Sequence, residues 1–211
     1  MAHEADIAVV DYGAGNIGSV LNLFSKIGAR AVRASTPEQL LAAPRLLLPG
    51  VGAFDHCMKA LSGSSLVPAL NDAVRHRQTP FLGICVGFQM LFAGSDEGTL
   101  PGLNWLPGRV VAFDRSKLLA HHKIPHMGWN NIHFAKSHPL FASLDPARFY
   151  FVHSYHAVLD QTDDAIAYAQ YGYDFCCAAG RDNIVGVQFH PEKSHRFGMQ
   201  LFKNFLAWQP A

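Results

Sequence analysis

The chain has 211 residues, 49% of them hydrophobic and 16% charged, a composition that excludes a disordered chain and a coiled coil. Seventeen Lys and Arg residues against sixteen Asp and Glu leave a formal net charge of +1, so we expect no nucleic-acid partner. No apolar run approaches the roughly 20 residues that span a bilayer, and we expect a cytoplasmic protein with no membrane partner.

The first half of the chain alternates short apolar runs with amphipathic stretches. Strands are predicted at 7–10, 31–32, 46–48 and 81–84, and helices at 19–27, from Thr36 onward, at 54–61 and at 66–77. Short apolar strands separated by helices are typical of a parallel sheet that is covered on both faces.

The second half is richer in strands. They are predicted at 110–113, 130–134, 149–152, 165–169, 175–179 and 184–189. A last helix follows Ser194, its predicted N-cap, because Phe197, Leu201 and Phe205 recur at helical spacing. No repeat or linker interrupts the chain, so we predict one α/β domain over 1–211, with a mixed, mostly parallel sheet and helices on both faces.

The segment from Gly13 to Gly18 matches the G-x-G-x-x-G pattern of dinucleotide-binding loops and lies between a predicted strand and a predicted helix. The acidic residue expected about 20 positions later is missing, and Arg33 stands near the end of the second strand instead. An arginine suits a 2′-phosphate, so an NADP-binding module stays a minor alternative to a plain strand-to-helix turn.

Gly83-Ile84-Cys85-Val86-Gly87 has the form of a nucleophile elbow with cysteine as the nucleophile. A sharp turn from strand to helix strains the central residue and leaves room only for small residues at the two glycine positions. The helix N-terminus favours a Cys85 thiolate, and the amide of Val86 points toward a developing oxyanion. We predict Cys85 as a nucleophile, with a buried structural cysteine as the alternative.

A base for this nucleophile is predicted after the strand at 184–189. His190 ends this segment, and Glu192 lies two residues later, on the same side of an extended chain. Pro191 restricts His190 to extended backbone. A carboxylate beside an imidazole fixes its tautomer and stabilises the imidazolium, so we predict a triad of Cys85, His190 and Glu192. The other histidines show no recurring ligand spacing, and no metal is predicted.

The segments around this triad resemble a known family, the class I (triad) glutamine amidotransferases, and among them the glutaminase subunits of imidazole glycerol phosphate synthases. The resemblance rests on Gly83–Gln89 and His190–Glu192 and extends through 11–16, 48–54, 125–130, 150–155 and 190–194. It implies a flavodoxin-like α/β fold. It also implies an enzyme of histidine biosynthesis that hydrolyses L-glutamine to glutamate and ammonia through a cysteine thioester, without a cofactor.

The resemblance also implies a role for each matched residue. Cys85 would attack the amide of glutamine, His190 would protonate the departing ammonia and then activate water, and Glu192 would orient His190. The oxyanion hole would be formed by backbone amides of Val51, Gly52 and Val86. Glutamine would be held by Gly50, Gln89, Glu97, Ser154 and Tyr155. A shift of one residue in the loop 94–98 would put Asp96 in the place of Glu97.

The chain has no evident site for a phosphorylated acceptor. The resemblance implies a heterodimer with a separate (β/α)₈-barrel cyclase, which receives ammonia through its interior. Five residues of the matched segments lack a triad role and are predicted to face that partner: Asn16, Met127, Trp129, Tyr150 and Lys193. Core packing of Trp129 and Tyr150 is the alternative. The segment 114–123, with His121 and His122, is interpreted as a surface loop.

Two other functions stay open from the sequence. A glutaminase subunit that serves another acceptor, such as anthranilate, would share the triad, but the segments 11–16 and 125–130 argue against it. A nucleotide-binding or regulatory module with an inactive elbow is the alternative of a different class. The pairing of His190 with Glu192 argues against that module.

Overall fold

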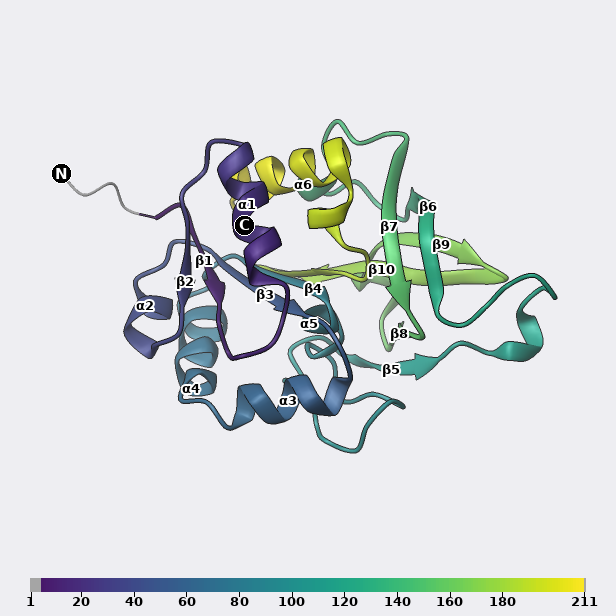
Figure 1. The fold of residues 1–211 in the computed structure, drawn as a ribbon, viewed down its shortest axis with the longest axis horizontal. Helices are drawn as coiled ribbons and strands as arrows, with labels where there is room; N and C mark the ends of the chain where they lie inside the picture. Colours follow the sequence, from purple (N-terminus) through teal and green to yellow (C-terminus); the bar gives the residue numbers. More distant parts are fainter. Residues whose placement is uncertain (1–4, 211) are drawn as a thin grey trace.

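The computed structural model describes residues 5–210, which form a mixed eleven-stranded sheet flanked by helices (Figure 1). The strands are β1 (Ile7–Val10), β2 (Ala31–Ala34), β3 (Leu46–Gly50), β4 (Phe81–Cys85), β5 (Gly108–Ala112), β6 (His126–Phe134), β7 (Ala147–His153), β8 (Tyr155–Leu159), β9 (Ala165–Tyr171), β10 (Tyr173–Arg181) and β11 (Ile184–Val187). The α-helices are α1 (Ile17–Lys26), α2 (Pro37–Leu41), α3 (Phe54–Ser62), α4 (Leu66–Asn71), α5 (Val86–Gln89) and α6 (His195–Ala207).

The sheet has a parallel half and an antiparallel half. Its strand order is β2-β1-β3-β4-β11-β10-β9-β6-β7, with β8 paired to β10 and β5 paired to β8. The strands from β2 to β11 pair in parallel, and every pairing beyond β11 is antiparallel. β1, β3, β4 and β11 are buried along their whole length, as expected for parallel strands covered on both faces. The predicted single α/β domain with a mixed sheet is confirmed.

Helices cover both faces of the parallel half. α1 and α6 contact each other on one face, and α3 and α4 lie together on the other (Figure 1). α1 buries Ile17, Val20 and Phe24, which recur at helical spacing. Phe24 stacks on Phe202 of α6, with ring centroids 4.4 Å apart. Across residues 5–210, no helix is long and apolar enough to cross a bilayer.

Three predicted features differ from the structure. The helix predicted at 66–77 is interrupted, because α4 ends at Asn71 and a π turn follows at Asp72–His76, where the buried Asn183 amide donates to the carbonyl of Val74 at 2.8 Å. Strand β8 was not predicted. Ser194 is the N-cap residue of α6, as predicted, but its side chain makes no capping bond, because its Oγ accepts from the Tyr150 N–H at 3.0 Å and donates to the carbonyl of His190 at 2.6 Å.

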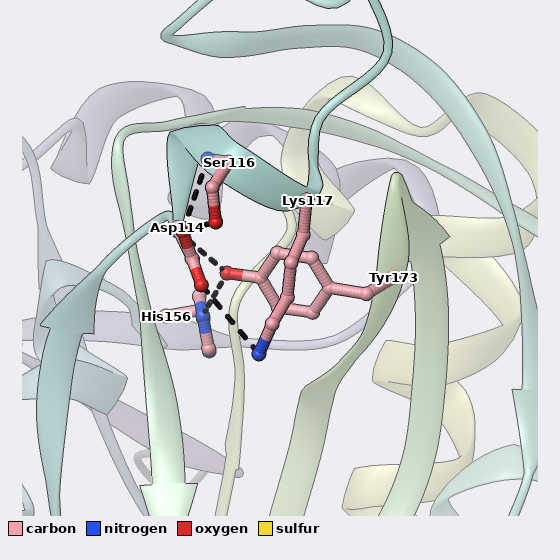
Figure 2. Close-up of polar contacts among 5 residues, drawn as sticks. All are labelled: Asp114, Ser116, Lys117, His156 and Tyr173. Atoms are coloured by element: carbon pink, nitrogen blue, oxygen red, sulfur yellow. Dashed lines mark hydrogen bonds and ion pairs between the residues drawn. The ribbon is translucent and has the colours of Figure 1, made fainter.

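The segment interpreted as a surface loop is mostly exposed, but it is anchored to the neighbouring strands (Figure 2). The Asp114 N–H donates to Tyr173 Oη at 3.0 Å, and this hydroxyl lies 2.9 Å from His156 Nε2. The Asp114 carboxylate accepts from the Ser116 N–H at 3.0 Å and pairs with Lys117 at 3.5 Å. Strands β8 and β10 therefore hold the start of the loop.

Candidate active site

Cys85 ends β4 and immediately precedes the single turn of α5. Its φ of 55° and ψ of −112° are rarely adopted by residues with a side chain. Two residues before and two residues after Cys85, neighbouring backbone leaves no room for a side chain. A Cβ at Gly83 would lie 2.8 Å from the carbonyl oxygen of Gly87, and a Cβ at Gly87 would collide with the carbonyl of Leu48 in β3. The predicted strained turn at Cys85 is confirmed.

His190 reaches the same edge of the sheet because β11 pairs in parallel with β4, with Val187 opposite Ile84. His190 Nδ1 lies 2.7 Å from Glu192 Oε1, and both side chains are 2% exposed. The extended chain predicted through Glu192 is wrong, because Pro191 begins a 3-10 turn. His190 itself is extended, as predicted, with φ −104° and ψ 94°.

Glu192 and Cys85 both affect the pKa of His190. Glu192 occupies Nδ1, and Nε2 has no hydrogen-bond partner within the described part of the chain. Burial lowers the pKa of His190, but the charge of Cys85, together with the hydrogen bond and charge of Glu192, outweighs burial and raises this pKa above its ordinary value. The site therefore favours the imidazolium form of His190, next to the predicted nucleophile Cys85.

A pocket of about 320 Å³ opens beside Cys85 and His190. It is lined by Val51, Gly52, Cys85, Val86, Gln89, Glu97, Pro125, Val152, His153, Ser154, Tyr155, His190 and Lys193. Of the predicted catalytic, oxyanion and glutamine-binding residues, only Gly50 and Glu192 do not line it. Gly50 pairs with Cys85 across β3 and β4, and Glu192 contacts His190. The structure thus brings these predicted residues together.

The turn after β3 carries two of the predicted oxyanion residues. Gly52 has a φ of 96°, which favours glycine. The hydroxyl of Tyr12 donates to the carbonyl of Pro49 at 2.8 Å, and the thiol of Cys57 donates to the carbonyl of Val51 at 3.4 Å. Sequence reasoning missed both donors: Tyr12 is 37 residues from Pro49, and Cys57, six residues from Val51, lies on α3, where only the fold shows that its thiol turns back to the carbonyl.

The structure separates the two acidic residues between which the sequence left a choice. Glu97 lines the pocket, and its Oε2 accepts from the backbone N–H of Phe54 at 2.9 Å. Asp96 forms an ion pair with Arg109 and does not line the pocket. Gln89 also lines the pocket, and its Nε2 lies 3.3 Å from the carbonyl oxygen of Tyr155. The carboxylate available to a bound ligand is therefore that of Glu97.

Sequence reasoning missed Gln188 and His153, which are both buried. Gln188 Nε2 lies 3.8 Å from Cys85 Sγ, and its Oε1 accepts from Gln89 at 3.0 Å. A polar residue between Val187 and Phe189, in an otherwise apolar strand segment, is the signal that could have indicated it. His153 lines the pocket directly before two predicted glutamine-binding residues.

Four of the predicted partner-facing residues lie outside the pocket, and Lys193 lines it. Met127 is 61% exposed and Trp129 37% exposed, and both project from the same face of β6. Trp129 stacks on His195 with ring centroids 5.6 Å apart and contacts Tyr150 edge-on at 6.3 Å. Met127, Trp129 and the half-buried Tyr150 thus form a surface cluster rather than part of the core. Asn16 is the N-cap residue of α1.

The Gly13–Gly18 segment forms a plain strand-to-helix turn. Gly15 has a φ of 103°, and a Cβ there would lie 3.0 Å from Pro49. Arg33, considered for a 2′-phosphate, instead pairs with Asp11 at 3.4 Å. Among residues 5–210, no group of three or more His, Cys, Asp and Glu residues could hold a metal ion.

Comparisons with known proteins agree on one family. The family model Glutamine amidotransferase class-I matches residues 8–208. "Imidazole glycerol phosphate synthase subunit HisH 2" of Pseudomonas aeruginosa is 47% identical over 201 residues, which are 95% of this chain and 98% of that protein. "Imidazole glycerol phosphate synthase subunit HisH" of Bdellovibrio bacteriovorus is 48% identical over 200 residues, 94% of this chain and 98% of that protein.

Solved structures of low sequence identity share the fold. "Structure of PurLQS from Thermotoga maritima" superposes with a TM-score of 0.72 at 15% identity, over 97% of this chain and 99% of that chain. "Crystal structure of glutamine amidotransferase" superposes with a TM-score of 0.71 at 17% identity, over 96% of this chain and 98% of that chain.

Proposed function

Because this chain belongs to the class I glutamine amidotransferase family, we propose that its pocket hydrolyses the side-chain amide of L-glutamine. We further propose that the chain is the glutaminase subunit of an imidazole glycerol phosphate synthase in histidine biosynthesis, which the names of its relatives support. The observation that carries the proposal is the strained Cys85 beside the buried His190–Glu192 pair in one pocket. Two expectations stay predictions: that a glutamine amidotransferase domain spans 1–211, and that the protein is cytoplasmic.

The proposed reaction has two halves. The Cys85 thiolate attacks the amide carbon, and backbone amides of Val51, Gly52 and Val86 stabilise the oxyanion. His190 then protonates the amide nitrogen, the C–N bond breaks, and ammonia leaves a glutamyl thioester. His190 next takes a proton from water, whose oxygen attacks the thioester. The C–S bond breaks, and glutamate and the thiolate are released.

The proposed substrate contacts follow from the lining of the pocket. The Glu97 carboxylate lies where it would pair with the α-ammonium group of glutamine. The Ser154–Tyr155 backbone and Gln89, which line the same pocket and contact each other, would hold the α-carboxylate end. Gly50 supports the oxyanion turn, because a Cβ there would collide with the backbone of Val86.

Ammonia released into water is mostly protonated at neutral pH and is then no nucleophile. We therefore propose that a cyclase subunit, a (β/α)₈ barrel, docks over the pocket in a heterodimer and receives the ammonia directly. The exposed Met127 and Trp129, with Tyr150 and Lys193 beside them, support docking on this side. Asn16, at the N-terminus of α1, is proposed to extend the docking surface.

Glutamate release from glutamine tests the proposal, with the chain alone and with the barrel cyclase present. Glutamine labelled with ¹⁵N in its side-chain amide shows which acceptor receives the released ammonia. The proposal expects glutamate release and ¹⁵N in the cyclase product, even with excess unlabelled ammonium in solution. Glutamate release with label reaching only a different acceptor would favour another amidotransferase. No glutamate release under either condition would refute the glutaminase.

A further inference from the structure

Two buried histidines form a hydrogen-bonded line that ends at the wall of the pocket. His126 and His153 are directly opposite each other in the β6–β7 pair, and His126 Nδ1 lies 2.9 Å from His153 Nε2. His153 Nδ1 lies 2.8 Å from the carbonyl oxygen of Tyr155. At the other end, Asn130 Nδ2 lies 3.3 Å from His126 Nε2 and 2.8 Å from the carbonyl oxygen of Gln170.

The contacts determine where each proton sits. The carbonyl of Tyr155 only accepts, so His153 Nδ1 carries a hydrogen, and Nε2 of this neutral ring accepts. His126 Nδ1 must then donate to it, and His126 Nε2 accepts from the amide of Asn130. A proton added to either ring would place two N–H groups against each other. The line is therefore complete only when both rings are neutral.

The surroundings keep both rings neutral and fixed. His126 is 3% and His153 6% exposed. Burial is the main cause that lowers the pKa of His126 to about 4 and the pKa of His153 well below its ordinary value. Phe151 stacks on His126 at 4.9 Å, and Phe175 packs against His153 at 5.1 Å between ring centroids. Tyr171 closes the other side of His126 at 4.1 Å.

His156, a third buried histidine nearby, belongs to a different set of hydrogen bonds. His156 Nδ1 donates to the carbonyl of Ala157 at 3.1 Å, and its Nε2 accepts from Tyr173, which accepts from the backbone of Asp114 (Figure 2). This second line ties β8 to the surface loop and does not lead to the pocket. Only the line through His153 reaches the segment that is proposed to hold glutamine.

We propose that His126 and His153 are positioning residues for glutamine, which orient the Ser154–Tyr155 backbone toward the substrate. The carbonyl of Tyr155 accepts from both His153 and Gln89, so the two contacts fix one peptide unit at the pocket wall. Neither histidine touches the reacting atoms in this proposal, and the inference rests on the proposed glutaminase activity.

Two variants of His126 separate positioning from general support of the fold. In His126→Asn, the amide nitrogen lies near the place of Nδ1 and still donates to His153. In His126→Gln, it lies near the place of Nε2 and this donor is lost. His133→Gln is the matched control on the same strand, because His133 is exposed and pairs with Asp174. Glutaminase kinetics are measured with the barrel cyclase present, and alkylation of Cys85 counts the active sites.

We expect His126→Gln to raise the KM for glutamine about fivefold, the effect of losing one hydrogen bond of about 1 kcal/mol, with kcat per active site within about twofold of wild type. His126→Asn and His133→Gln are expected to keep the wild-type KM. Equal KM values in the Asn and Gln variants, or a loss confined to kcat, would overturn the positioning role. A wild-type protein without glutaminase activity would instead overturn the proposed function itself.

A second measurement does not depend on the folding of the His126 variants. Histidine ¹⁵N spectra of Cys85→Ala in complex with the cyclase report the tautomers directly, with and without glutamine. Neutral rings with hydrogen on Nδ1 in both His126 and His153, and a shift of the His153 resonance when glutamine binds, are expected. A charged ring, hydrogen on Nε2, or a His153 resonance indifferent to glutamine contradicts the proposal.

Discussion

Cys85, His190 and Glu192 have different proposed roles in the reaction. Strained backbone exposes the thiol of Cys85 to the pocket, and the buried carboxylate of Glu192 orients the imidazole of His190 at 2.7 Å. The carboxylate also stabilises the positive charge that His190 gains when it takes up a proton. Cys85 therefore depends on His190, and His190 depends on Glu192. Removal of the Glu192 carboxylate should lower the reactivity of Cys85.

Glu192→Gln tests this dependence. The amide keeps the shape of the side chain but removes the negative charge, so the His190 imidazolium loses its stabilisation. We expect kcat for glutamine hydrolysis to fall on the order of 10²-fold or more, with little change in the free energy of unfolding. Glu38→Gln, at an exposed position in α2, is the control. Activity of Glu192→Gln within twofold of wild type would contradict the role of the carboxylate.

Sequence alone predicted the residues whose pattern is local. The glycine pattern within Gly83–Gly87 predicts the turn at Cys85 without any distant contact. His190 and Glu192 are likewise close in sequence. The sequence predicted Glu97 and left Asp96 as an alternative, because only the ion pair between Asp96 and Arg109, a tertiary contact, removes Asp96 from the pocket. His153 was missed because its buried partner His126, on β6, is 27 residues away in sequence.

At the scale of elements, the elbow depends on how closely β3, β4 and α5 approach. Gly87 packs against the backbone of Leu48, and Gly50 packs against the backbone of Val86 and Gly87. Main chain rather than side chain fills this space, so the neighbours cannot move aside by changing rotamer. The glycines of the elbow therefore stabilise the junction of sheet and helix as well as the strained turn.

Gly87→Ala is expected to lower the free energy of unfolding by about 1–3 kcal/mol or more, the range for overpacking, and to displace Cys85. The control is Gly18→Ala in α1, where a Cβ meets nothing within 4 Å. This control is expected to be neutral or to stabilise by up to about 1 kcal/mol, because alanine favours helices. Urea unfolding measures both changes. A Gly87→Ala protein as stable as Gly18→Ala would contradict the close packing.

Prediction of the elements succeeded where the pattern was strong and failed where tertiary contacts decide. The buried parallel strands β1, β3 and β4 were predicted from their apolar runs. Strand β8 was missed because only Ser154 separates it from β7, without a glycine or proline to mark a turn. The π turn after α4 depends on the amide of Asn183, which no local pattern could show.

At the scale of the whole molecule, burial or partial burial disfavours the charged form of several histidines. Burial is the main cause that lowers the pKa values of His126 and His138 to about 4 and the pKa of His153 well below its ordinary value. The unfolded chain takes up these protons near the ordinary pKa of about 6.5, so it binds more protons than the folded chain below that pH. His190, with its raised pKa, is protonated in both states in this range and adds no slope.

The free energy of unfolding is therefore expected to fall as the pH decreases from about 6.5 to about 4. Each buried histidine contributes about 1.4 kcal/mol per pH unit. Urea titrations at a series of pH values measure the slope, and His126→Asn should reduce it by the share of one histidine. A free energy of unfolding that is constant over this range would show that these rings are not held neutral.

The proposed docking surface for the cyclase includes Met127 and Trp129, which are exposed on one face of β6, while the other face of this strand is buried or half-buried. Trp129→Ala is expected to raise the Kd for the proposed cyclase partner about 30-fold, the effect of losing a contact of about 2 kcal/mol. The turnover of the isolated chain should not change. Leu119→Ala, 57% exposed in the surface loop, is the control. Titration calorimetry that gives equal Kd values for both variants would exclude this docking surface.

The most direct test of the glutaminase is mass spectrometry of the protein quenched in acid during glutamine turnover, with the cyclase present. The mechanism predicts a glutamyl thioester on the peptide that contains Cys85, and neither an adduct nor glutamate release in Cys85→Ala. Turnover with Cys85 unmodified and with Cys85→Ala as active as wild type would contradict it.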